Sequence, residues 1–173
     1  MKVGFLSDKN GFRAPLHPDS LQKYDKTQLF VEKDIFNNLD LTANDYKKLK
    51  VLNKTSLKQM DVVCFVDSVD IDVIKTLKAD AAVVGLFDAK TKKEIKKLRP
   101  DVSLYDFFQL PRISRAQNLD ALSSQANLLG YSSVLRASLE TSNVIPMMTT
   151  AAGNISPAKV LILGIGVAGL QAI

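Results

Sequence analysis

The stretch Pro111–Gln125, PRISRAQNLDALSSQ, divides the sequence into two parts of different character. It holds two arginines, two glutamines, an aspartate and several hydroxyl side chains, and it begins with a proline. Such a density of charged and hydrogen-bonding groups suits a polar ligand better than a packed core. The alternative is a solvated helix N-terminus with Ser114 and Asp120 as caps. The residues alone leave both interpretations open.

Before residue 111, short apolar runs alternate with segments of helical character. We expect strands over Val3–Leu6, Leu29–Glu32, Val62–Val66, Ala81–Phe87 and Val102–Tyr105. We expect helices to open at Pro18–Leu21, after the capping arrangement Thr42–Asp45, over Ile71–Leu77, and from a capping box at Thr91–Glu94 through Leu98. Strands alternating with helices at this spacing predict βα units around a mostly parallel sheet, and therefore an α/β fold.

After residue 111, apolar residues recur with a helical period. They predict one long helix from about Asp120 to Glu140, with Gly130 tolerated inside it. A loop is expected over Thr149–Pro157. Lys159–Leu163 is rich in aliphatic and β-branched residues, which predicts a buried parallel strand.

Glycines at 164, 166 and 169 follow that expected strand directly, as Gly164-x-Gly166-x-x-Gly169. The first permits a tight turn, the second lets a pyrophosphate approach the backbone, and the third allows close helix packing. A phosphate would then meet the N–H groups of the following helix. An ordinary strand–turn–helix junction is the alternative. The acidic residue expected about 20 positions further on to bind a ribose is missing, because the sequence stops at Ile173.

The composition is that of a soluble globular protein, with 46% hydrophobic and 24% charged residues. The net charge of +5 comes mostly from lysines spread among apolar residues, as on solvated helix faces, so we expect no nucleic-acid binding. The single cysteine, Cys64, lies in an apolar run and is expected to be a small buried residue in a reducing compartment. The N-terminus does not resemble a signal peptide, and the apolar run Val160–Leu170 is shorter than the ~20 residues of a bilayer span.

The residue order from Pro111 to Tyr131 resembles a motif in the NAD(H)-binding alpha subunit of the proton-translocating NAD(P) transhydrogenases. Pro146–Gly153 and Pro157–Ile173 resemble the same family, whereas the resemblance is thin before residue 111. It implies a Rossmann-like (flavodoxin-like) domain over residues 1–110. It implies that residues 111–173 form a linker helix, then the first strand and glycine loop of an incomplete NAD(H)-binding Rossmann domain.

The resemblance also implies which residues contact NAD(H). The loop Arg112–Asp120 would lie over the nicotinamide end, with Arg112, Gln117 and Asp120 as the signature polar triad. The full expected set is Arg112, Ile113, Ser114, Arg115, Gln117, Asn118, Leu119, Asp120, Ser123, Gly164, Gly166, Val167 and Gly169. An arginine can bind pyrophosphate oxygens as a fork, an amide can hold the ring carboxamide, and the aspartate would orient Arg112 or a hydroxyl. Because direct hydride transfer needs no general base, we expect no catalytic residue. We also expect no metal ligand.

In the first half, the segment Arg13–Asp19 resembles the family's entry loop, with His17 in place of a small residue. We expect His17 to be solvated. The related alanine dehydrogenases use a lysine and a histidine in this half to hold their keto acid. The comparable positions here are Phe65 and Gly85, so we expect no alanine dehydrogenase activity.

The resemblance implies hydride transfer from NADH to NADP, coupled to proton movement. NADP(H) would bind a partner domain rather than this chain. The expected partners are a second copy in a homodimer, the remainder of the alpha subunit, and a membrane-embedded, NADP-binding beta subunit. The chain would lie peripherally on the cytoplasmic side of the inner membrane. An excised fragment, a split gene product and a decayed copy remain open. So do a non-catalytic, partner-binding module and an NAD-linked amino-acid or keto-acid dehydrogenase.

Overall fold

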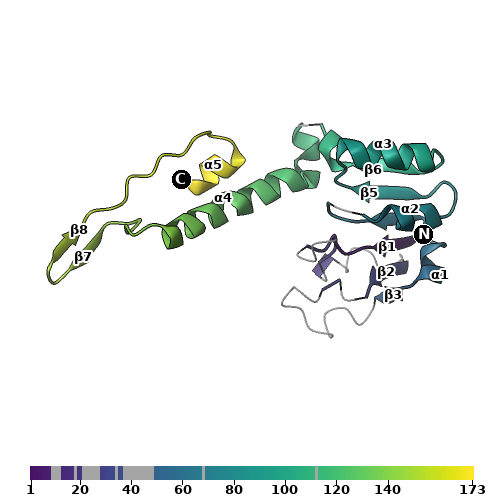
Figure 1. Cartoon of the computed structure of the whole chain (residues 1–173), viewed down its shortest axis with the longest axis horizontal. Coiled ribbons are helices and arrows are strands. Elements are labelled where there is room, and N and C mark those ends of the chain that lie inside the picture. The colour runs from purple at the N-terminus through teal and green to yellow at the C-terminus, as the bar shows by residue number, and fades with distance from the viewer. Residues whose placement is uncertain are drawn as a thin grey trace. The chain divides into compact units, whose positions relative to one another are not determined.

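The computed structural model describes residues 1–8, 13–17, 19–20, 28–33, 35–36, 49–67, 69–111 and 113–173. The chain divides into two compact units, Met1–Gln109 (unit 1) and Leu110–Ile173 (unit 2) (Figure 1). Each unit has its own secondary structure.

Unit 1 is built on a parallel sheet, as the sequence predicted. Its six strands within the described residues are β1 (Lys2–Phe5), β2 (Gln28–Glu32), β3 (Lys50–Leu52), β4 (Val62–Cys64), β5 (Ala82–Gly85) and β6 (Ser103–Asp106). They lie in the order β3-β2-β1-β4-β5-β6, and every pairing is parallel. This is the Rossmann order rather than the flavodoxin order. The chain reverses its direction of travel across the sheet between β1 and β4, which makes that pair a topological switch point.

Successive side chains of each strand point to opposite sides of the sheet, and the central strands bury apolar residues on both sides. Val3 and Phe5 of β1 pack with Leu29 and Val31 of β2 in one apolar cluster. Strand residues whose side chains point to the opposite side of the sheet join a second cluster. This cluster includes Phe30, Met60, Val63, Val83 and Ile95. Near-continuous apolar strands of this kind are typical of parallel sheets with both faces covered.

The helices of unit 1 in the described ranges are α1 (Lys54–Leu57), α2 (Ile71–Thr76) and α3 (Ala89–Leu98). Neither α1 nor β3 was predicted from the sequence. The predicted start of α3 was also wrong: the cap is Asp88, whose Oδ1 accepts from the N–H groups of Lys90 and Thr91 at 2.8 and 2.9 Å. The expected helix at Pro18–Leu21 and the cap at Thr42–Asp45 fall wholly or partly outside the described residues.

Arg99 joins the ends of two helices. It follows the last residue of α3, and its guanidinium donates to the carbonyls of Ile74, Leu77 and Lys78 at 3.0, 2.8 and 3.0 Å. It also forms a two-pronged ion pair with Asp101, at 2.9 and 2.7 Å. One side chain therefore satisfies carbonyl groups at the end of α2 that the helix itself leaves open.

Unit 2 contains a 3₁₀ helix η3 (Ser114–Leu119), the long helix α4 (Ala121–Glu140), the strands β7 (Met148–Thr150) and β8 (Gly153–Ile155), and a short helix α5 (Val167–Ala172). The long helix has the predicted extent. Thr149–Pro157 was wrongly expected to be a loop, since β7 and β8 pair there as an antiparallel hairpin. Gly153 enters that hairpin at a φ of 125°, a conformation that favours glycine.

The buried strand expected at Lys159–Leu163 is not present. This segment has no strand assignment, and Leu161 and Leu163 are 83% and 89% exposed. A parallel strand exists only when a neighbouring strand accepts its hydrogen bonds. In the described part of unit 2, the paired strands are β7 and β8, and they pair with each other.

Candidate functional site

The predicted polar segment ends at a well-formed helix cap. Asp120 is the N-cap of α4; its Oδ1 accepts from the N–H of Ser123 at 3.0 Å, and its Oδ2 accepts from the Ser123 hydroxyl at 2.6 Å. Asp120 thus satisfies a helix N–H that lacks a backbone partner and also fixes the Ser123 hydroxyl. Ser114 is not a cap, because η3 begins after Ile113 without a side-chain hydrogen bond.

The remaining predicted residues of this segment lie in or beside η3. Ala116 is its one buried residue, and the backbone is closed by a hydrogen bond from the Asp120 N–H to the Gln117 carbonyl at 3.1 Å. The exposed side chains are Ile113, Ser114, Arg115, Gln117, Asn118 and Leu119. Arg112 lies outside the described residues. The structure therefore brings Asp120 and Ser123 together and presents Gln117 to the surface.

Gly164 and Gly169 in the glycine turn have conformations or contacts that require glycine, although the strand predicted before the turn is absent. Gly164 has a φ of 103°, which favours glycine. A Cβ added to Gly169 would lie 1.9 Å from the Gly164 carbonyl oxygen, so no side chain fits there. A Cβ at Gly166 would meet no atom within 4 Å, which leaves the backbone open to an approaching group. The residues present thus fit a dinucleotide pyrophosphate, with Val167 at the start of α5.

A second close approach holds α5 against α4, and the two helices lie side by side (Figure 1). Gly130 is the buried residue of α4, and a Cβ there would lie 2.2 Å from the carbonyl oxygen of Ala168. The sequence predicted that the helix continues through Gly130, and it does, but the close packing of this glycine on Ala168 was not predicted. The signal was present in the sequence, since glycine inside a long helix costs stability unless close packing requires it.

In unit 1, polar side chains gather at the topological switch point, where the carboxyl ends of β1 and β4 meet. The guanidinium of Arg13 contacts Oδ2 of Asp8 at 3.3 Å and Oδ2 of Asp67 at 2.6 Å. The Asp8 side chain is almost fully buried. Beside them, the N–H and hydroxyl of Ser7 donate to Oε2 of Glu32 at 2.8 and 2.5 Å. The charged side chains at this switch point therefore bind one another and Ser7.

Phe65 and Gly85 lie directly against each other at the carboxyl ends of β4 and β5. A Cβ at Gly85 would lie 2.8 Å from two atoms of the Phe65 ring. That ring is 3% exposed and packs edge-on against Phe87, with the ring centroids 5.1 Å apart. An apolar ring therefore fills the space at the two positions that were compared with the lysine and histidine of alanine dehydrogenases.

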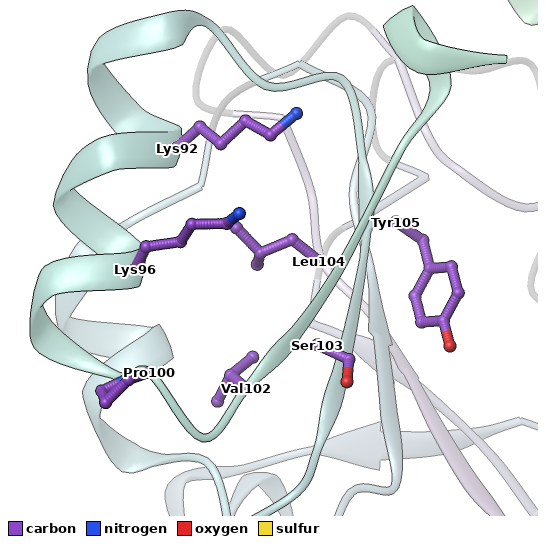
Figure 2. A pocket seen from close by; sticks show the side chains of 7 residues that line it. All are labelled: Lys92, Lys96, Pro100, Val102, Ser103, Leu104 and Tyr105. Carbon is purple, nitrogen blue, oxygen red and sulfur yellow. The ribbon is translucent and has the colours of Figure 1, made fainter.

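At the outer edge of the sheet, Lys92 and Lys96 of α3 point toward β6 over a shallow depression (Figure 2). Lys92 forms an ion pair with Asp106 at 2.8 Å. Burial raises the pKa of the Asp106 carboxyl. The hydrogen bonds from Lys92 and from the N–H groups of Phe108 and Phe87 outweigh burial and lower the pKa overall. The depression contains none of the residues predicted to bind a nucleotide.

Cys64 lies in β4 and is partly buried, less than the sequence predicted. Burial raises the pKa of the Cys64 thiol to about 11, as expected for a cysteine packed inside a sheet rather than a nucleophile. His17 is exposed, and its Nδ1 lies 3.4 Å from a carboxylate oxygen of Asp19. No group of three or more His, Cys, Asp or Glu side chains within the described residues is arranged to hold a metal ion.

Known proteins match both the sequence and the fold. The family model described as "Alanine dehydrogenase/PNT, C-terminal domain" matches residues 133–173. Over 98 residues the chain is 51% identical to the first portion of the NAD(P) transhydrogenase alpha subunit of Rickettsia prowazekii. The match covers 56% of this chain and 26% of that relative. The chain is similar to NAD(P) transhydrogenase alpha subunits. The resemblance inferred from the polar motif and the glycine turn is therefore confirmed.

The fold agrees with this relationship. The structure of a transhydrogenase from Sinorhizobium meliloti superposes with a TM-score of 0.90 at 31% identity, over 99% of this chain and 54% of that one. An L-alanine dehydrogenase superposes with a TM-score of 0.74 over 99% of this chain and 50% of that one. At 19% identity it supports the fold alone. The matches span about a quarter of the length of the curated relatives. Across the described ranges, every helix is too short or too polar to cross a membrane.

Proposed function

We propose that this chain supplies NAD(H)-binding residues to a proton-translocating NAD(P) transhydrogenase. The observation that carries the proposal is that unit 2 combines the polar segment before α4 with a glycine turn, and that α4 and α5 are in direct contact. The similarity to transhydrogenase alpha subunits supports the assignment to this enzyme rather than to another dinucleotide-binding protein.

The proposed binding residues are those predicted from the sequence, and each has a physical role. Gly164, Gly166 and Gly169 would let the pyrophosphate approach the backbone. Arg112 would bind pyrophosphate oxygens, and Gln117 would hold the ring carboxamide through its exposed amide. Asp120 would act by orienting the Ser123 hydroxyl, a role that the 2.6 Å hydrogen bond supports.

Bound NAD(H) would supply hydride chemistry through its nicotinamide ring, and NADP(H) on a partner domain would be the other member of the pair. The residues of this chain would bind and orient the dinucleotide, and they would have no proton to move. Proton translocation would belong to a membrane-embedded beta subunit. The remainder of the alpha subunit and a second copy of the chain complete the proposed assembly, which would lie on the cytoplasmic side of the inner membrane.

A partner-binding module without nucleotide is the second candidate. The exposed apolar residues of unit 2 favour it, among them Leu128, Leu139, Leu161, Leu163 and Ile165. Apolar surface of this extent is typical of protein interfaces. An NAD-linked amino-acid or keto-acid dehydrogenase is less well supported, because the Phe65 ring fills the space above Gly85.

The test is a fluorescence titration with NADH, first on the chain alone and then with the remainder of a transhydrogenase alpha subunit added. We expect saturable binding in the second case, weakened by Asp120→Ala. Lys96→Ala, at an exposed position of α3 in unit 1, is the control and should bind NADH as the wild type does. A folded chain that assembles with the added portion but binds no NADH would favour the partner-binding module.

A further inference from the structure

Gly130 lies where two backbones touch. An added Cβ would be 2.2 Å from the Ala168 oxygen, 3.0 Å from its carbonyl carbon and 3.1 Å from its Cα. All three are backbone atoms, so none can rotate away as the end of a flexible side chain could. Any side chain at residue 130 would therefore displace the first turn of α5 or bend α4.

The contact is made at the end of α5 that carries the glycine turn. Ala168 is the second residue of α5, and Gly166 is its N-cap. Gly169 packs so closely on the Gly164 carbonyl that we expect the glycine turn and the first residues of α5 to move together. A shift of α5 on α4 would therefore move the whole turn.

Other attachments of this segment are sparse. Between β8 and the glycine turn, the N–H of Ala158 donates to the Val144 carbonyl at 2.8 Å. α4 is the principal neighbour of α5 among the described elements. Gly130 lies nine residues after Ala121, the first residue of α4, which corresponds to about 14 Å along a helix axis. The contact thus fixes how far along α4 the turn lies from the Asp120 cap.

We propose that Gly130 is a positioning residue for nucleotide binding: by carrying no side chain, it fixes the glycine turn at a set distance from the polar segment at the start of α4. This inference rests on the proposed function and adds to it a residue that contacts no nucleotide. Replacing a glycine inside a helix by alanine ordinarily stabilises the helix. At residue 130 we expect the same substitution to be harmful instead.

The experiment compares Gly130→Ala with Ser132→Ala, which adds the same alanine to an exposed position on the same helix. Amide hydrogen exchange of the full chain follows the Leu170 N–H, which donates to the Gly166 carbonyl at 2.9 Å. The NADH dissociation constant is then measured with the remainder of an alpha subunit present. Far-ultraviolet circular dichroism checks that α4 stays helical.

For Gly130→Ala we expect exchange in α5 to become roughly tenfold faster and NADH binding roughly tenfold weaker, with α4 still helical. Ser132→Ala should stay within about twofold of the wild type in both. Unchanged exchange and affinity in Gly130→Ala would overturn the proposal, as would normal NADH affinity despite faster exchange. Loss of helix in Gly130→Ala alone would show a general folding role instead. A wild type that binds no NADH, with exchange still faster in Gly130→Ala, would refute the nucleotide function but leave the steric contact standing.

Discussion

Among the residues that the structure describes, the largest fully buried side chains, which include Met60, Ile74 and Ile95, all belong to unit 1. In unit 2, Leu139, Leu161 and Leu163 are each more than 80% exposed. Unit 1 encloses its apolar residues between sheet and helices, whereas unit 2 is held by one long helix, a hairpin and a backbone contact at Gly130. An apolar sequence therefore predicts burial only when neighbouring elements are available to cover it.

This contrast can be tested with one kind of substitution in each unit. Ile95→Ala removes a side chain with no exposed area, and we expect it to lower the free energy of unfolding by about 2–5 kcal/mol. Leu139→Ala removes a side chain that is 83% exposed and should change it by less than about 0.5 kcal/mol. Urea unfolding, followed by circular dichroism, measures both. Equal losses would show that unit 2 buries Leu139 in solution.

The close contact between Gly85 and Phe65 should also be sensitive to added volume. Gly85→Ala places a methyl group against the buried Phe65 ring, and we expect a loss of about 1–3 kcal/mol. A double-mutant cycle with Phe65→Leu checks the cause, because the smaller side chain should recover part of the loss from Gly85→Ala. Strictly additive effects would exclude the ring as the source of the strain.

Asp106 should contribute stability through its hydrogen bonds to Lys92 and to backbone N–H groups. Asp106→Asn should cost about 1–3 kcal/mol at neutral pH, since it leaves buried donors poorly satisfied. The pKa of this carboxyl is lowered in the folded protein, so its contribution is present above about pH 4, the ordinary value, and is lost as the pH falls through the lower folded value. Unfolding measured from pH 7 down to about pH 2 should show a weaker acid dependence in the variant. Parallel profiles would contradict this.

In unit 2, loss of the Asp120 cap of α4 should lower stability by less than loss of a core side chain of unit 1. Asp120→Ala removes both hydrogen bonds to Ser123 and should lower helix stability by about 1 kcal/mol. Asp120→Asn keeps a capping oxygen and should recover most of the helix content at the same temperature. If Asn recovers the helix but not NADH affinity, the negative charge of Asp120 has a role beyond capping.

The weakest of these effects concerns Cys64, which should alkylate slowly at neutral pH because its thiol pKa is raised to about 11. The rate with iodoacetamide should rise steadily as the pH approaches that value. In urea, the unfolded chain should be alkylated at the same rate as free cysteine. Rapid labelling of the folded chain at pH 7 would show that β4 opens readily.

Much of unit 1 could be predicted because its signals are local. Each of the five expected strands is a short apolar run, and each is found, while α1 was missed although Asn53 and Ser56 form a capping box around its first turn. In unit 2, the cap at Asp120 and the length of α4 could be predicted for the same reason.

Two of the misses in unit 2 depend on contacts that the local sequence does not show. Lys159–Leu163 has the composition of a strand, but a strand needs a hydrogen-bonded neighbour that composition cannot supply. A glycine inside a long helix suggests close packing, but the sequence around residue 130 does not show that the packing partner is Ala168. The hairpin at Met148–Ile155 was hidden because its alanines, glycine and asparagine suggested a loop.

Arg99 should also affect how unit 1 unfolds. Its guanidinium reaches from the end of α3 to the final carbonyls of α2, so neither helix can fray there without breaking the bonds that hold the other. We therefore expect α2 and α3 to open together rather than independently, with similar hydrogen-exchange protection.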